Sequence, residues 1–183
     1  MMVMKKVMII LSVLALAACA PEKEEKVVYR QAAANVPTSG LSCLVYDLTG
    51  TNPTSIPYGM ENQSAVQSIR VGQLDANTFS QVTLPTEVGM NCVTTLTIPD
   101  DDNYTIYLAS DDGSEMYLDG YRVISNDGTH GETTKSFSGF FKRGAKVDLQ
   151  VRYFNQFGPR ALKLSWKGSF FPQQTISSSY LSF

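Results

Sequence analysis

The fold of this chain is decided by residues 104–128, which read YTIYLASDDGSEMYLDGYRVISNDG. Apolar and polar side chains alternate on both sides of the dipeptide Asp119-Gly120. This dipeptide favours a two-residue type I′ turn, because both central positions of that turn need a positive φ angle. The segment therefore predicts a β-hairpin, and the preceding Asp111-Asp112-Gly113 has the composition of a further tight turn.

The alternation continues along the rest of the chain. It is clearest at residues 147–153 and 162–166, where each strand has one apolar and one polar face. No long amphipathic helix or internal repeat interrupts it, so we expect an all-β fold, an antiparallel β-sandwich of two sheets. Residues 49–64 lack a pattern and predict a long loop. Further strands are expected at residues 43–48, 79–84, 92–98 and 104–109.

The composition excludes several kinds of protein. The 183 residues are 43% hydrophobic and 17% charged, as in an ordinary globular domain. A net charge of -2 without a long basic run argues against nucleic acid as a partner, because that affinity depends on phosphate neutralisation. With three cysteines and one histidine, any metal site should rest on oxygen ligands.

The first residues predict a targeting signal. Lys5 and Lys6 precede an apolar run at residues 7–18, which is shorter than the roughly 20 residues of a membrane-spanning helix. The run ends in Leu16-Ala17-Ala18-Cys19, which resembles the bacterial lipobox. We therefore expect cleavage before Cys19 and acylation of its thiol, the alternative being an ordinary secretory signal in which Cys19 is incidental.

This signal sets the expected domain organisation. Residues 1–18 form the lipoprotein signal peptide, residues 19–40 carry the lipidated Cys19 and a flexible polar tether, and residues 41–183 form the sandwich domain. The acyl chains would attach the protein to a membrane of the cell envelope. Ala20, by resemblance to sorted lipoproteins, favours the outer membrane.

The two remaining cysteines are expected to pair. Cys43 and Cys92 both lie in strand-like segments, and an envelope protein folds in an oxidising compartment. A disulfide is the simplest interpretation, and two buried free thiols are the alternative.

Several motifs together resemble one known family. Residues 104–128, His130 after the second Asp-Gly turn, Val151-Arg-Tyr-Phe-Asn155 and Leu162-Lys-Leu-Ser-Trp166 are similar to the signature of the protective antigen domain (PA-14) family. The resemblance runs from about Gly40 to the C-terminus and is loose before Val93. It implies a β-sandwich of the kind found in bacterial toxins, glycosidases and fungal flocculin adhesins, which often binds carbohydrate.

The adhesin branch of that family implies a calcium site. There, two adjacent aspartates joined by a cis peptide bind Ca²⁺ together with a loop asparagine, and the ion holds sugar hydroxyls. Asp111, Asp112 and Asn155 match these positions, and carbonyl groups of Phe157 and Pro159 would add ligands. The alternative is a plain polar turn at Asp111-Asp112-Gly113. The loop at residues 156–160 also lacks the Trp that shapes the sugar pocket in some adhesins.

Other polar groups are interpreted as structural. Residues 100–103 read as a solvated hairpin, since they lack the spacing of a calcium loop. Hydrolase, metalloprotease and phosphate-loop motifs do not occur in the sequence, so we expect no enzyme activity. The carboxylates of Glu115, Asp119 and Glu132 leave glycoside hydrolysis as a remote alternative.

The expected function follows from these features. We expect a lipid-anchored outer-membrane protein whose sandwich binds a glycan or cell-wall polysaccharide with Ca²⁺, for adhesion or wall recognition. The alternative is a structural envelope module that contacts proteins and binds no sugar.

Overall fold

A computed structural model describes residues 38–84 and 86–183. The predicted signal peptide, Cys19 and most of the predicted tether lie outside these residues. Within the described part of the chain, no helix is long and apolar enough to span a membrane. The elements are β1 (Leu41–Asp47), η1 (Met60–Asn62), β2 (Gln67–Val71), β3 (Val88–Thr97), β4 (Asp102–Asp111), β5 (Ser114–Leu118), β6 (Tyr121–Asn126), β7 (Thr133–Phe141), β8 (Lys146–Asn155), β9 (Ala161–Lys167), β10 (Gln174–Thr175), η2 (Ser178–Tyr180) and β11 (Leu181–Ser182).

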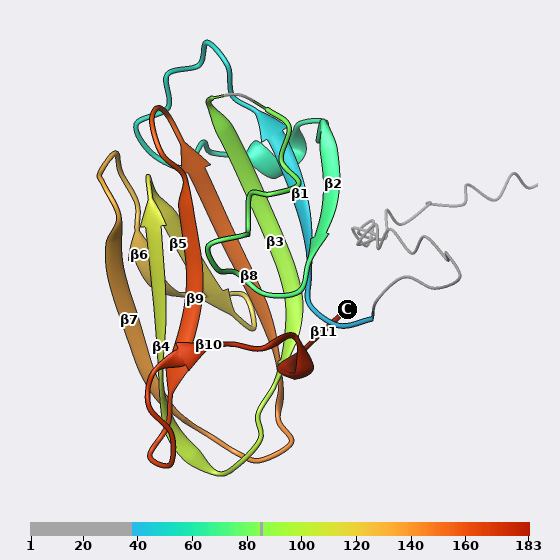
Figure 1. Ribbon diagram of the computed structural model, residues 1–183, viewed down its shortest axis with the longest axis vertical. Helices are drawn as coiled ribbons and strands as arrows, with labels where there is room; N and C mark the ends of the chain where they lie inside the picture. The colour runs from blue at the N-terminus through green and yellow to red at the C-terminus, as the bar shows by residue number, and fades with distance from the viewer. Residues whose placement is uncertain (1–37, 85) are drawn as a thin grey trace, which may run out of the picture. The chain divides into compact units, whose positions relative to one another are not determined.

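The strands form two antiparallel sheets that pack face to face (Figure 1). The seven-stranded sheet has the order β2-β1-β3-β8-β5-β6, with β11 paired to one end of β3. The four-stranded sheet has the order β10-β9-β4-β7. The predicted all-β sandwich is confirmed. The Asp119-Gly120 turn joins β5 to β6 as predicted, and both of its residues have positive φ.

Alternation of side chains builds the core. In β8, Val147, Leu149, Val151 and Tyr153 are buried between the sheets, and the residues between them face outward. The core near the start of β4 is filled by Trp166, which is almost fully buried. Its ring stacks on that of Tyr104, with the ring centroids 5.2 Å apart. Burial of each large apolar side chain contributes about 1.5–3 kcal/mol to the stability of the folded state.

The predicted disulfide is present. Cys43 of β1 lies directly opposite Cys92 of β3, and the two sulfurs are bonded. Both residues are completely buried in the core. The pair therefore crosslinks neighbouring strands on the inner face of the seven-stranded sheet.

The prediction of a strand at residues 79–84 is wrong. Residues 79–81 lie in a turn and residues 82–84 have no regular secondary structure. Phe79 packs its ring 5.1 Å from that of Tyr153, and the backbone carbonyl of Leu74 accepts a hydrogen bond from Leu164 of β9. The apolar residues that suggested a strand are thus core contacts made from a loop. Conversely, β2 and β7 are strands that the sequence pattern did not indicate.

The prediction that residues 100–103 form a solvated hairpin is also wrong at Asp102. Asp102 is only 7% exposed and is the first residue of β4. Its carboxylate accepts hydrogen bonds of 2.6 Å from both the Oγ and the backbone N–H of Ser169. These bonds lower the pKa of Asp102 and hold the chain after β9 against the sheet.

Candidate functional site

Three connections meet at one end of the sandwich. They follow β4, β6 and β8, whose ends carry Asp111, Asn126 and Asn155 (Figure 1). Asp111 and Asp112 are joined by a cis peptide bond, as the family resemblance implied. The residues predicted to hold calcium all lie at this end.

Asp112 fastens the three connections together. Its side chain is 7% exposed. Oδ1 accepts a hydrogen bond from the backbone N–H of His130 at 2.9 Å, and Oδ2 accepts one from the backbone N–H of Gln156 at 2.8 Å. One carboxylate therefore bridges the β6–β7 loop and the β8–β9 loop.

Asp111 is held in an environment that disfavours its charge. Partial burial, followed by the nearby charge of Asp112, raises the pKa of Asp111. A cation placed at these two carboxylates would favour their charged forms, which is the electrostatic condition for a metal site.

Asn155 closes the other side of the site and is completely buried. Its side-chain amide satisfies its neighbours when Nδ2 donates to the carbonyl oxygen of Pro159 at 3.0 Å and to that of Asp111 at 3.2 Å. A calcium ion would need the amide oxygen instead, so binding would turn this amide by half a rotation. Tyr153 lies beneath, with its hydroxyl donating to the Asp111 carbonyl at 2.5 Å, and burial raises the pKa of this phenol.

The groups at this site that could bind a metal ion would all do so through oxygen atoms. Two carboxylates, one amide and the Pro159 carbonyl give a mixed set of the kind that Ca²⁺ accepts in a shell of six to eight ligands. Across residues 38–84 and 86–183, no group of three or more His, Cys, Asp or Glu side chains is placed to hold a metal. Amide and carbonyl groups would therefore have to supply ligands. Phe157, also predicted as a carbonyl ligand, lies in the same loop with its ring 60% exposed.

Contacts from further loops support the site, and sequence reasoning did not find them. Oδ1 of Asp127 accepts hydrogen bonds from the backbone N–H groups of Ile56 and Gly128, which ties the β1–β2 loop to the β6–β7 loop. Gly113 lies against Asp127 with no space for a Cβ atom. The signal that could have shown this is the glycine directly after the Asp pair.

The carboxylates considered for hydrolysis are each engaged in an ion pair or a hydrogen bond, and Glu132 does so beside Asp111. Glu115 is buried on the outer face of the seven-stranded sheet, between Arg122 and Arg152. Glu132 pairs with Lys163 at 2.7 Å, and Asp119 Oδ1 accepts from the backbone N–H of Asp148 at 2.9 Å. These three residues serve as structural partners in the described fold.

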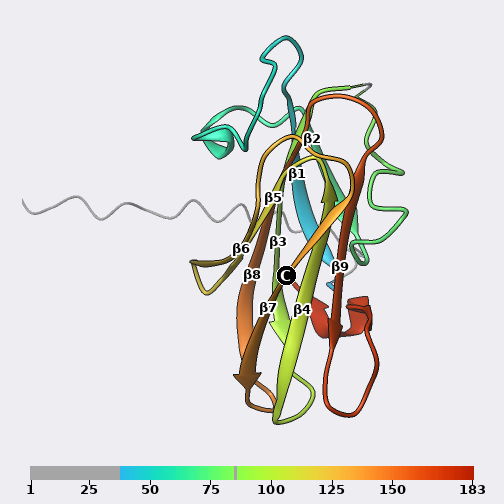
Figure 2. The ribbon, with the colours of Figure 1, turned by 90° about the vertical axis from the view of Figure 1, so that its left-hand side faces the viewer.

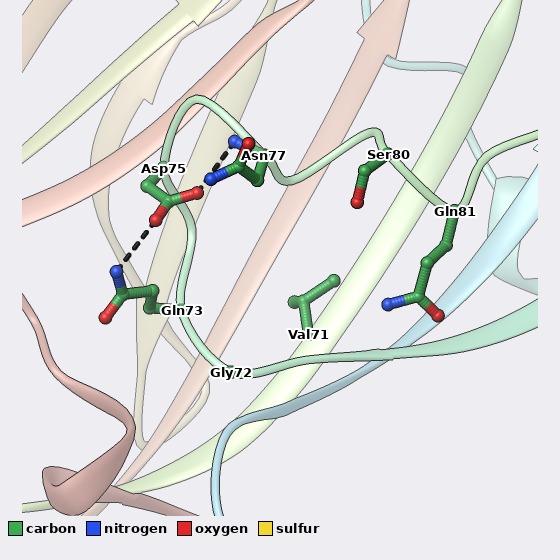
Figure 3. A pocket seen from close by; sticks show the side chains of 7 residues that line it. All are labelled: Val71, Gly72, Gln73, Asp75, Asn77, Ser80 and Gln81. Carbon is green, nitrogen blue, oxygen red and sulfur yellow. Dashed lines mark hydrogen bonds between the residues drawn. The ribbon is translucent and has the colours of Figure 1, made fainter.

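A shallow pocket of about 190 Å³ lies apart from these residues, in the connection that follows β2. Figure 3 shows that its lining is mostly polar, with the carboxylate of Asp75 joined to Gln73 and Asn77. Both Asp75 oxygens are thus used within the loop.

Fold and site together define a β-sandwich module with an acidic loop site at one end. The profile of the PA14 domain matches residues 60–178, which is well over half of the sequence. The chain therefore belongs to the PA14 domain family.

One characterised protein shares part of this sequence. The chain is 28% identical over 80 residues to the anti-sigma-I factor RsgI3 of Acetivibrio thermocellus, an alignment that covers 44% of this chain and 12% of that protein. The chain thus spans only a small part of that relative.

Two solved structures share the fold. The PA14 sugar-binding domain from an RTX adhesin superposes with a TM-score of 0.65 at 14% identity, covering 80% of this chain and 99% of that domain. The epithelial adhesin 6 A domain from Candida glabrata, solved in complex with Galβ1-3GlcNAc, superposes with a TM-score of 0.59 at 14% identity, covering 82% and 89%.

Proposed function

We propose that this protein is a lipid-anchored envelope module that binds a glycan through a calcium ion held by Asp111, Asp112 and Asn155. The observation that carries the proposal is the set of oxygen groups at one end of the sandwich. The Asp112 carboxylate lies near that of Asp111 and accepts from the backbone of Gln156, and the neighbouring Asn155 amide contacts the carbonyls of Asp111 and Pro159. Adhesion or recognition of wall polysaccharide is the role that suits such a module.

The chemistry of the site supports calcium over magnesium. Side-chain and backbone oxygens from three loops form a set that adjusts to a large ion, whereas Mg²⁺ demands a tight octahedral shell and keeps its water. Protein groups would leave part of the Ca²⁺ shell open, and vicinal hydroxyls of a sugar can complete it. Phe157, with its ring exposed in the adjacent loop, offers an apolar surface for a sugar ring.

The similar structures support a glycan as the partner. The RTX adhesin domain is a sugar-binding domain, and the Candida glabrata adhesin was solved with a bound disaccharide. The end of this sandwich that carries Asp111, Asp112 and Asn155 is therefore the first place to test for sugar.

The described chain begins its first strand at a distance from the candidate site. Asn155 at the site pairs with Val88 at the start of β3, whereas the carbonyl of Gly40 accepts from Thr94 on the same strand. Six residues of strand place these points about 20 Å apart. The described domain therefore starts away from the site, which supports attachment through the residues that precede it.

Thermal unfolding with calcium tests the proposal. Ca²⁺ at about a hundred times its dissociation constant should add roughly 2.7 kcal/mol to the free energy of unfolding, because it binds the folded state. Mg²⁺ should add much less, and glycan-array binding should require Ca²⁺ and vanish with chelator.

An unchanged melting temperature across millimolar Ca²⁺ would reject the metal site. Calcium stabilisation without any glycan binding would favour the second candidate, a structural module that contacts proteins.

A further inference from the structure

The outer face of the four-stranded sheet is exposed to solvent. Its strands β4, β7 and β9 run along the length of the sandwich (Figure 2). Alternate residues of β4 are buried in the core, and those between them point outward and are each partly or fully exposed. The outward residues form one row, which consists of Asn103, Thr105, Tyr107, Ala109 and Asp111.

This row leads directly away from the candidate calcium site. Asp111 is its last member and lies opposite Ala161 at the start of β9. At the rise of an antiparallel strand, Tyr107 lies about 14 Å and Asn103 about 27 Å from Asp111 along β4. The row is therefore long enough for several linked sugar rings.

Two aromatic rings lie along this row. Tyr107 is at its centre and is partly exposed, and Nζ of the exposed side chain of Lys167 lies 5.9 Å from its ring centroid. At the end remote from the calcium site, Phe140 of β7 lies opposite Asn103 and is 60% exposed. Directly opposed residues of antiparallel strands share a face, so both rings belong to this surface. Each offers an apolar plane on which a sugar ring can pack.

Short hydroxyl side chains surround the two rings. Those of Thr105 and Ser138 are hydrogen-bonded to each other at 2.9 Å. A hydroxyl group both donates and accepts hydrogen bonds, so it can pair with a sugar hydroxyl in either direction. The register places the following hydroxyl residues on this face: Thr105, Thr134, Ser136, Ser138, Ser165 and Thr175.

The same composition disfavours a protein or a nucleic acid on this face. Serine is depleted in protein interfaces, and serine and threonine are under-represented among the residues that dominate binding energy there. The outward-facing cations of these strands are Lys163 and Lys167, and Lys163 is paired with Glu132 beside Asp111. One remaining cation is too little charge to bind a phosphate backbone.

We infer that an extended polysaccharide chain binds along this face, with one sugar at the calcium ion and further sugars on Tyr107 and Phe140. Ala109 lies between Asp111 and Tyr107, and its small side chain leaves room for the chain to pass from the ion to the first ring. The inference rests on the proposed calcium-dependent sugar binding. It adds the substrate class, which is a polymer of several linked sugars and not a terminal disaccharide.

Isothermal titration calorimetry of the full chain carrying Cys19→Ser, which removes the predicted acylation site, tests the inference. The probes are linear dimers and hexamers of glucose, N-acetylglucosamine, mannose and galactose in the presence of Ca²⁺. The hexamer of the preferred sugar should bind at least about tenfold more tightly than its dimer, because further sugar rings gain an aromatic partner.

Variants of the two aromatic residues show where this gain arises. Tyr107→Ala should remove most of it and leave the affinity for the dimer unchanged, which also reports that the variant is folded. Tyr107→Phe keeps the ring and should keep the gain, whereas Phe140→Ser should reduce it. The matched control is Tyr121→Ala, which removes a tyrosine that is 77% exposed on β6 of the other sheet and should change neither affinity.

The outcomes separate this inference from the proposed function. A hexamer that binds no better than its dimer, while Ca²⁺-dependent binding of the dimer persists, overturns the inference and leaves the proposed function standing. A gain that survives Tyr107→Ala combined with Phe140→Ser overturns it as well. Loss of all Ca²⁺-dependent sugar binding in the parent chain rejects the proposed function, and the inference with it.

Discussion

The hydroxyl of Tyr153 donates a 2.5 Å hydrogen bond to the backbone carbonyl of Asp111. Tyr153 belongs to β8 of the seven-stranded sheet and Asp111 to the end of β4 in the four-stranded sheet. The bond therefore joins the two layers directly beneath the candidate site, and the ring of Phe79 packs on Tyr153 from the side. One inner-face strand residue, Tyr153, and one loop residue, Phe79, thus hold the Asp pair in place.

Neutralising each aspartate of the pair should have different effects. Asp111→Asn should abolish the calcium-dependent gain in melting temperature without lowering the calcium-free melting temperature, because it removes a charge that burial and Asp112 disfavour. Asp112→Asn should lower the calcium-free stability by about 2 kcal/mol as well. An amide has one acceptor oxygen, and both oxygens of Asp112 accept from backbone N–H groups.

Melting of both variants in calcium and in chelator separates these effects. Equal loss of calcium-free stability in the two variants would contradict the prediction that Asp112, and not Asp111, stabilises the calcium-free fold.

Gly113→Ala should destabilise the fold by about 1–3 kcal/mol, because a Cβ atom at this position overlaps Phe154 and lies 2.8 Å from Oδ1 of Asp127. The shift should also loosen the β6–β7 loop that holds Asp112. Gly131→Ala in that same loop is the control, since a Cβ there meets nothing within 4 Å. Urea unfolding of both variants measures the difference, and similar values for the two would show that the packing around Gly113 yields easily.

Replacing both Cys43 and Cys92 by Ala should lower the free energy of unfolding by about 4 kcal/mol, the value that chain entropy assigns to a crosslink over this separation of 49 residues. Because the pair is fully buried, the native protein should also resist reduction, and therefore alkylation of Cys43 and Cys92 after treatment with reductant. Denaturant unfolding with and without reductant gives the first quantity and mass spectrometry the second. A loss well below 1 kcal/mol would mean that the unfolded chain gains little freedom.

Asp102→Asn should destabilise the protein at neutral pH and make little difference in acid. The hydrogen bonds from Ser169 lower the pKa of Asp102, so the folded state holds its proton less tightly than the unfolded state. The stabilisation is complete above the unfolded pKa of about 3.9 and disappears as the pH falls through the lower folded value. Chemical unfolding of wild type and variant at pH 7 and below pH 3 tests this, and a constant difference between them would contradict it.

The lipid anchor remains a prediction from the sequence. Cys19→Ser should leave the protein unprocessed or release it from membranes, because acylation at Cys19 supplies the only anchor we predict. Fractionation of cells that express either form, with immunodetection of the pellet and supernatant, measures the change. Equal retention of the variant as a mature protein in membranes would show that Cys19 is incidental.

Local sequence determined the strands and turns whose signals lie within a few residues. The Asp119-Gly120 hairpin, the alternation in β8 and β9 and the choice of a two-sheet sandwich follow from side-chain period and turn chemistry. The Asp111-Asp112 pair was likewise visible in the sequence through its family resemblance.

Only the tertiary structure decided which residues distant in sequence pack against one another and which of them surround the candidate site. Phe79 looked like part of a strand, but it lies in a loop and its ring packs against Tyr153, a residue distant in sequence. The pairing of Val88 with Asn155 brings the β8–β9 loop to the site, and Asp112 is buried there by backbone donors of His130 and Gln156. Burial and hydrogen-bond satisfaction depend on every element that packs around a residue, so they are set by the assembled sandwich and not by the residues beside it in sequence.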